Sequence, residues 1–367
     1  MSFYTSLVRP LLFRFDPEFM HRVALTFGQT LGSAGWLQAW LRKQFAFSDP
    51  RLETEVCGIR FSNPLGLAAG WDKSGQAVEF AAALGFGHVE IGSVSADPSD
   101  GNPRPRLWRL PEDRALVVHY GLPNDGADVV ARRLGKLRRS VPLGINLVKT
   151  NQGSHAPPDC DDAILDDYVR SIRRLKEQAD YLTLNLSCPN TELGREFFAD
   201  KAHLEAFLQV VAEQGIRCPL FLKLSPTGGV KFIETVLEVV EPHRCVKGFI
   251  FNLPPGIRGD LKTAPERLAR MRGAVSGQPV ESLMNDCLRE LYARMDRRRY
   301  RLLAAGGVFG AADAYRKIRL GASLVQLVTA LIYEGPAVIG RINEGLCELL
   351  ERDGFKSVAD AVGTLEF

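Results

Sequence analysis

The chain has 367 residues, a length that suits one large barrel domain with an appendage better than a single ordinary α/β sandwich. Charged residues make up 24% and hydrophobic residues 46%, a balance typical of a folded globular protein and not of a disordered one. The net charge of only +3 argues against a dedicated nucleic-acid-binding protein. The seven cysteines form no C-x-x-C pair, which argues against a disulfide scaffold or a zinc site and favours a reducing cytoplasm.

The N-terminal segment 1–44 is expected to form short helices that stand apart from a main domain over 45–367. Asp16 and Pro17 are typical of a helix start, and apolar residues then recur at helical spacing up to Trp40. Two interpretations of the segment stay open. It is a small helical cap docked on the main domain, or an interfacial element that enters a membrane surface. No apolar run is long enough to span a bilayer, and no signal-peptide pattern is present.

The main domain repeats one unit, a short apolar run followed by a helical pattern. The predicted strands lie at 64–68, 88–92, 143–147, 180–186, 219–224, 247–252, 302–305 and 323–328. A hairpin is predicted near 52–62, before the first of them. Eight such units favour an α/β fold of the (β/α)8 TIM-barrel type over an open sheet. The lack of G-x-G-x-x-G after the first strand argues against a dinucleotide-binding fold.

A barrel of this type carries its chemistry at the carboxyl ends of its strands. The residues expected there are Lys73, Ser93, Asn146, Asn185, Cys188, Asn190, Lys223, Asn252, Gly306, Gly307 and Thr329. This set is rich in amides and holds two lysines and one thiol. It contains no carboxylate pair for glycoside hydrolysis and no cluster of ligands for a metal. It therefore indicates a site for an anionic or carbonyl-rich cofactor and a planar polar ligand.

Four features of this set have both a functional and an ordinary interpretation. The glycine pair Gly306-Gly307 with Thr329 suits a phosphate cradle, although loop glycines are common. Lys223 interrupts an apolar strand, which is costly unless the amine meets an anion or an electron-rich ring, or reaches solvent. Lys73 closes the loop after the first strand and could be a surface residue. Cys188 could be a buried hydrophobe, or a thiol that removes a carbon-bound proton.

These motifs resemble the dihydroorotate dehydrogenases of the membrane-associated, quinone-reducing class over nearly the whole chain. The resemblance rests on long motifs in the same order, namely Asn-Pro-Leu-Gly-Leu-Ala-Ala-Gly-Trp-Asp-Lys (63–73), Gly-Phe-Gly-His-Val-Glu-Ile-Gly-Ser-Val (85–94), Pro-Arg-Leu-Trp-Arg-Leu (105–110), Leu-Gly-Ile-Asn (143–146), Asn-Leu-Ser-Cys-Pro-Asn-Thr (185–191), Ser-Gly-Gln-Pro (276–279) and Gly-Ala-Ser-Leu-Val-Gln-Leu (321–327).

The resemblance implies FMN in the barrel mouth, oxidation of dihydroorotate, and reoxidation of the flavin by a quinone. By position it implies FMN contacts from Ala69, Gly70, Lys73, Ser93, Asn146, Asn185, Lys223, Asn252, Gly277, Gly306, Gly307 and Thr329. It implies Cys188 as the base and substrate contacts from Lys73, Asn185, Asn190, Thr191 and Asn252. It also implies a quinone site with His21 and Arg106, and peripheral association of segment 1–44 with the cytoplasmic face of a membrane.

Several departures from the family pattern concern the substrate pocket. Cys188 stands where the quinone-reducing class has serine, and Val118 stands where the family has one of four substrate-binding asparagines. Leu122 replaces a family phenylalanine, Leu253 a threonine and Val328 a tyrosine. Three hypotheses follow: a quinone-dependent dihydroorotate dehydrogenase with an unusual pocket, a related FMN oxidoreductase with another substrate, and a non-catalytic flavin-binding barrel.

Overall fold

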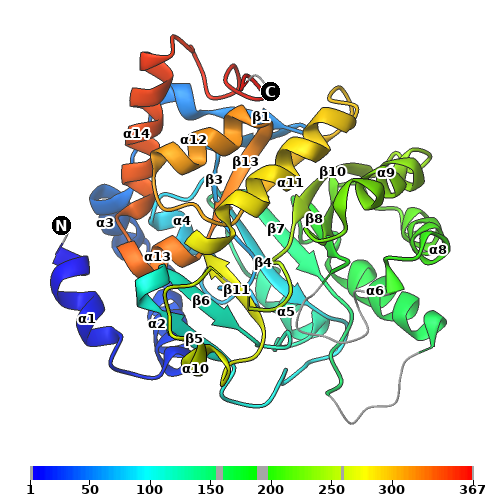
Figure 1. The fold of residues 1–367 in the computed structure, drawn as a ribbon, viewed down its shortest axis with the longest axis horizontal. Helices are drawn as coiled ribbons and strands as arrows, with labels where there is room; N and C mark the ends of the chain where they lie inside the picture. The colour runs from blue at the N-terminus through cyan, green and yellow to red at the C-terminus, as the bar shows by residue number, and fades with distance from the viewer. Residues whose placement is uncertain (1–2, 154–159, 188–196, 258–259, 366–367) are drawn as a thin grey trace.

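The protein is an eight-stranded parallel barrel surrounded by helices (Figure 1). The computed structural model describes residues 3–153, 160–187, 197–257 and 260–365. The barrel strands are β3 (Leu65–Leu67), β4 (His88–Val94), β7 (Leu143–Leu147), β8 (Tyr181–Asn185), β9 (Leu220–Leu224), β10 (Val246–Phe251), β12 (Arg301–Ala305) and β13 (Ala322–Leu327). They follow one another around the barrel in chain order, and β13 pairs with β3 to close it. All eight predicted strands and the predicted barrel are confirmed.

Helices cover the outside of the barrel and bury its apolar outer surface. They are α4 (Val78–Ala83), α5 (Ala127–Leu134), α6 (Asp161–Leu175), α8 (Lys201–Ala212), α9 (Gly229–Val240), α11 (Glu281–Arg294), α12 (Ala311–Arg319), α13 (Thr329–Glu334) and α14 (Val338–Arg352). The short α10 (Pro265–Leu268) lies in the segment between β10 and β11 and buries none of its residues. Single turns lie at η2 (Pro50–Leu52), η3 (Pro111–Asp113) and η4 (Gln278–Val280). The strand residues that face these helices, such as Val89 and Ile91 on β4, are fully buried.

A hairpin closes the amino end of the barrel, at the predicted position. Its strands are β1 (Thr54–Val56) and β2 (Ile59–Phe61), and the two turn residues Cys57 and Gly58 both have positive φ, as a tight two-residue hairpin turn requires. Val56 and Phe61 of the hairpin pack with side chains inside the barrel, which form a separate apolar cluster with them. The bottom of the barrel is therefore a packed core and not a channel.

A three-stranded antiparallel sheet lies outside the barrel and was not predicted. It consists of β5 (Leu107–Leu110), β6 (Ala115–Val118) and β11 (Ala274–Gly277), in the order β11-β6-β5. The segments that form it follow β4 and β10 in the chain, so both leave the barrel at the carboxyl ends of strands. The sheet thus stands beside the barrel mouth, next to the N-terminal helices (Figure 1).

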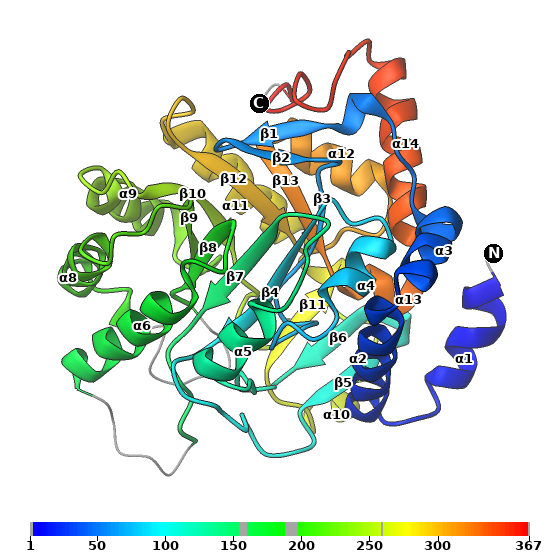
Figure 2. The ribbon, with the colours of Figure 1, turned by 180° about the vertical axis from the view of Figure 1, so that it is seen from behind.

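The N-terminal helices are η1 (Tyr4–Val8), α1 (Arg9–Leu12), α2 (Pro17–Ser33) and α3 (Gly35–Phe45). The predicted helix start is confirmed, because the Asp16 side chain accepts a hydrogen bond from the Phe19 backbone amide at 2.7 Å. The helices lie on one side of the barrel, and α6, α8 and α9 lie on the opposite side (Figures 1 and 2). No helix in the described ranges is both long and apolar enough to cross a membrane.

Candidate active site

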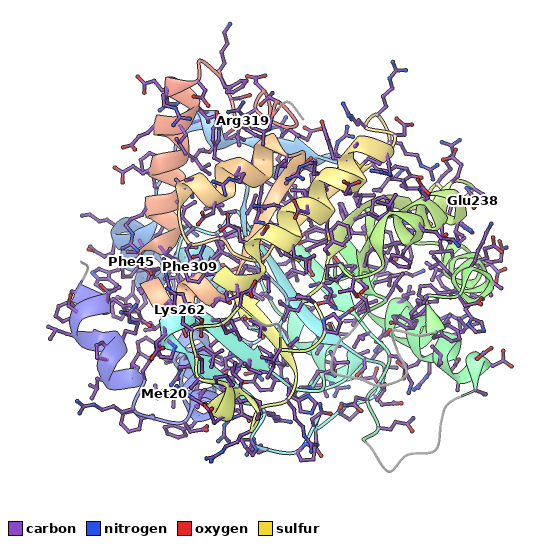
Figure 3. All side chains as sticks on the ribbon, viewed as in Figure 1. Met20, Phe45, Glu238, Lys262, Phe309 and Arg319 are labelled. Carbon is purple, nitrogen blue, oxygen red and sulfur yellow. The ribbon has the colours of Figure 1, made fainter. Side chains whose placement is uncertain are left out.

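One cavity of about 430 Å³ runs from the barrel mouth to the N-terminal helices. Its barrel end is lined by the ends of strands and the loops after them, and its other end by α1, α2 and η1. Met20 on α2 and Phe309 after β12 both line it, and both lie on the side of the molecule that carries the N-terminal helices (Figure 3). A volume of this size is typical of a site for a cofactor or a small organic molecule.

Polar side chains gather at the barrel end of the cavity, where Ser93, Asn185, Lys223 and Asn252 all contribute to its lining. Asn252 Nδ2 donates to Asn185 Oδ1 at 3.0 Å, and Asn185 Nδ2 donates to Ser93 Oγ at 3.1 Å. Lys223 is the last residue but one of β9, and only 7% of its surface is exposed. The structure thus brings together these four residues, which the sequence placed at four different strand ends.

Asn146 does not line the cavity but lies one layer below it, inside the barrel. It is fully buried, accepts a hydrogen bond from the Ser93 hydroxyl, and donates through Nδ2 to Glu90 Oε1 at 2.9 Å. Glu90 on β4 is a fully buried carboxylate that the sequence analysis missed. The signal was available, since Glu90 interrupts an apolar strand as Lys223 does.

Five glycines with positive φ line the cavity, namely Gly70, Gly92, Gly277, Gly306 and Gly307. A Cβ atom at Gly307 would lie 2.4 Å from Cβ of Glu281, and one at Gly277 would lie 2.4 Å from the Arg114 carbonyl oxygen. Neighbouring atoms of the protein therefore exclude a side chain at both positions. Thr329 lies next to Gly277 and also lines the cavity.

Lys73 lies on another wall of the cavity, which Ala69 and Gly70 also line. Its Nζ donates to the Gly70 carbonyl oxygen at 2.7 Å and lies 3.9 Å from the centre of the Tyr120 ring. Burial, followed by repulsion from Arg106, lowers the pKa of Lys73 to about 7. An anionic ligand in the cavity would favour the charged form of this amine.

His21 on α2 is held by two hydrogen bonds at the wall of the cavity. Its Nε2 lies 2.7 Å from the Trp71 carbonyl oxygen, and its Nδ1 lies 2.9 Å from the Tyr120 hydroxyl oxygen. Burial, with a smaller contribution from Lys73, lowers the pKa of His21 to about 3. The imidazole is therefore neutral at physiological pH.

Arg106 does not line the cavity and instead binds α2 to the segment just before β5. Its Nη2 lies 2.8 Å from Glu18 Oε1, and the two side chains are only 8% and 10% exposed. Arg104 contacts the same carboxylate at 3.0 Å. Burial raises the pKa of Glu18, but the two guanidinium groups outweigh it and the net shift is downward. In this structure Arg106 fixes the position of the helix that carries His21.

The remaining sequence candidates, Cys188, Asn190 and Thr191, lie outside the described residues. The departing residues Val118, Leu122, Leu253 and Val328 all line the cavity and add to its apolar surface. Among the residues that the structure describes, no group of three or more His, Cys, Asp or Glu side chains could hold a metal.

Comparisons with known proteins agree with this geometry. The family model described as dihydroorotate dehydrogenase matches residues 51–350. A quinone-type dihydroorotate dehydrogenase of Natronomonas pharaonis is 39% identical over 362 residues, and one of Halobacterium salinarum is 40% identical over 360 residues; each alignment covers 97% of this chain and 98% of the relative. The ligand-free dihydroorotate dehydrogenase of Eimeria tenella superposes with a TM-score of 0.82 at 28% identity, covering 95% of this chain and 99% of that structure.

The chain belongs to the dihydroorotate dehydrogenase family. Membership of this family implies a flavin cofactor. The described residues suit one, because the cavity lining combines two lysines, several amides and glycines that expose only backbone.

Proposed function

We propose that the protein oxidises dihydroorotate to orotate, with FMN bound at the barrel mouth and a quinone as the final electron acceptor. FMN supplies the hydride acceptor when bound. The residues proposed to hold it are Ala69, Gly70, Lys73, Ser93, Asn146, Asn185, Lys223, Asn252, Gly277, Gly306, Gly307 and Thr329. All but Asn146 line the cavity, and Asn146 supports Ser93 from below.

The substrate is proposed to lie at the same polar end, against Lys73, Asn185 and Asn252. Lys73 pairs with the substrate carboxylate, and the two amides bind the ring carbonyl and N–H groups. Oxidation removes a proton from one ring carbon and a hydride from its neighbour. Cys188, which follows β8 in the chain, is the proposed base for the proton, and the nearby Asn190 and Thr191 are proposed substrate contacts.

The quinone is proposed to enter from the other end of the cavity. Leu12, Phe13 and Met20 line that end and give it the apolar surface that a quinone ring and tail require. His21 lies between this apolar end and the segment 69–73, which is proposed to contact FMN, since it bonds to both Trp71 and Tyr120. Arg106 is proposed to act there through Glu18 and α2.

Segment 1–44 is proposed to associate with the cytoplasmic face of a membrane as a peripheral element. Large apolar side chains on α1 to α3 and the segment before them are exposed to solvent, and Phe3 and Trp36 are each 74% exposed. The others are Leu7, Leu11, Phe15, Phe19, Val23, Phe27 and Trp40. An exposed apolar surface of this kind, with aromatic and basic residues, is typical of helices that lie in the headgroup region.

The observation that carries the proposal is the single cavity with one polar and one apolar end. Two substrates of opposite polarity, a charged dihydropyrimidine and a lipid-soluble quinone, can reach one flavin from the two ends of this cavity. The apolar residues Val118 and Leu253 leave fewer hydrogen-bond partners on one side of the pocket. This feature was the reason for the alternative hypothesis, a related FMN oxidoreductase with another substrate. The relatives of Natronomonas pharaonis and Halobacterium salinarum are both quinone-type dihydroorotate dehydrogenases and give that alternative no support.

Steady-state assays with dihydroorotate and a short-chain ubiquinone test the proposal. We expect quinone-dependent formation of orotate and its loss, by at least 100-fold, in Cys188→Ala with its flavin still bound. Formation of orotate at the wild-type rate by Cys188→Ala would show that another group is the base. An absence of orotate with FMN-loaded wild-type enzyme would contradict the proposed substrate.

A further inference from the structure

Glu90 is the most deeply buried acid near the cavity, and donors surround it. Asn146 Nδ2 and Gln326 Nε2 each lie 2.9 Å from its carboxylate oxygens. The hydroxyl oxygens of Tyr181 and Thr183 each lie 3.2 Å away. Both carboxylate oxygens therefore accept hydrogen bonds from neighbouring side chains.

The contact with Asn146 sets the direction of the hydrogen bonds above it. Because Asn146 presents its NH2 group to Glu90, its Oδ1 faces upward and accepts the proton of the Ser93 hydroxyl. The Ser93 oxygen is then free to accept from Asn185 Nδ2, and Asn185 Oδ1 in turn accepts from Asn252 Nδ2. A continuous chain of hydrogen bonds therefore runs from the buried carboxylate to the cavity, and each side chain in it has a fixed donor side and a fixed acceptor side.

Glu90 also faces the lysine of this site. Its Oε1 lies 3.9 Å from Lys223 Nζ, and the two side chains are 0% and 8% exposed. In a poorly solvated interior a carboxylate at this distance stabilises the ammonium form substantially. The same negative charge disfavours any electron density added to a ring bound above Lys223.

We propose that Glu90 is a positioning residue for the flavin. It fixes the direction of the hydrogen bonds along Asn146, Ser93, Asn185 and Asn252, and it partly balances the positive charge of Lys223. The inference rests on the proposed flavin site. It predicts two separate effects, one on the affinity for FMN through the ordered amides and one on the flavin reduction potential through the charge.

Glu90→Gln tests both effects with a side chain of nearly the same shape. We expect the dissociation constant for FMN, measured by flavin fluorescence with the apoprotein, to rise by about tenfold. The potential of the bound flavin, measured by anaerobic dye equilibration, should become more positive, because a negative charge near the reduced ring is removed. Wild-type values of both quantities in Glu90→Gln would overturn the proposal.

Two further variants separate positioning from a merely structural role. Tyr181→Phe removes one donor to the same carboxylate but keeps its charge and its contact with Asn146, so affinity and potential should stay at wild-type values. Glu90→Asp keeps the charge but is shorter by one methylene, so the affinity for FMN should fall while the reduction potential of the bound flavin stays at the wild-type value. A shifted potential in Glu90→Asp or Tyr181→Phe would contradict the proposed role of the charge. If wild-type protein itself fails to bind FMN, the proposed flavin site is wrong, whatever the variants do.

Discussion

Tyr120 donates its hydroxyl proton to Nδ1 of His21 across 2.9 Å, and this contact joins the N-terminal helix α2 to the loop after β6. The direction follows from the second bond of the imidazole. A carbonyl oxygen can only accept, so Nε2 must carry the proton that it donates to Trp71 at 2.7 Å, which leaves Nδ1 as the acceptor. With a pKa of about 3, His21 keeps this neutral form at all physiological pH values.

His21→Phe should separate the two half-reactions. The polar end of the cavity is untouched, so dihydroorotate should reduce the flavin at close to the wild-type rate. Reoxidation by a quinone should slow by about tenfold, the equivalent of one lost hydrogen bond of about 1.4 kcal/mol. Stopped-flow measurement of each half-reaction checks this, with His243→Phe, remote from the cavity, as the control. Equal slowing of both half-reactions would contradict a role confined to the quinone end.

Restoring polar groups on the apolar wall should strengthen binding of the pyrimidine. Val118→Asn with Leu253→Thr offers two new hydrogen-bond partners, each worth roughly 0.5–1.5 kcal/mol. We expect the affinity of the oxidised enzyme for orotate, titrated by flavin absorbance, to rise by at least tenfold. Val129→Asn, on the exposed face of α5, serves as the control. An unchanged affinity would show that these positions do not face the substrate.

His88 should make the protein sensitive to acid. It is fully buried inside the barrel between Phe61 and Tyr181, and neither of its ring nitrogens has a hydrogen-bond partner among the described residues. Burial lowers its pKa from 6.5 to about 3. Between these values the unfolded chain binds a proton that the folded chain does not, so the free energy of unfolding decreases as the pH falls from about 6.5 toward 3.

His88→Phe should therefore stabilise the protein and flatten this dependence. The variant removes two unsatisfied buried nitrogens, which at neutral pH is worth roughly 1–3 kcal/mol. The slope of stability against pH between 4 and 6 should decrease by up to about 1.4 kcal/mol per pH unit, and the part due to His21 should remain. Urea unfolding at several pH values measures both. A steeper slope, or a loss of stability at pH 7, would contradict the prediction.

The eight barrel strands could be predicted because each is a short apolar run followed by a helical pattern. The sheet of β5, β6 and β11 could not, because Ala274–Gly277 pairs with Ala115–Val118, a segment that lies far away in the sequence. No local pattern encodes such a pairing.

The candidate site was predictable where strand ends supply the residues. Ser93, Asn185, Lys223 and Asn252 could be placed together because parallel strands end at one mouth of the barrel. The roles of Glu90 and Glu18 could not be foreseen, because each depends on partners that only the fold brings near, Asn146 and Arg106 respectively.

The exposed apolar face of α2 should drive membrane binding. Phe19 and Phe27 are 47% and 58% exposed, so Phe19→Ser with Phe27→Ser should leave the melting temperature nearly unchanged. Partitioning onto phospholipid vesicles, measured by sedimentation, should fall by at least tenfold, because the loss of each phenylalanine ring removes apolar area that would be buried in the membrane. The control Val230→Ser also removes an exposed apolar side chain, but from α9 on the far side of the molecule, and it should bind vesicles as the wild type does. Wild-type partitioning of the double variant would place the membrane contact elsewhere.

Anaerobic addition of dihydroorotate to the purified, FMN-loaded protein is the most direct measurement of the proposed function. The polar end of the cavity should hold the substrate against the flavin, so the visible flavin absorbance should bleach at once and return when a quinone is added. A flavin that stays oxidised in excess dihydroorotate would contradict the proposed substrate, and would direct attention to the apolar residues Val118 and Leu253.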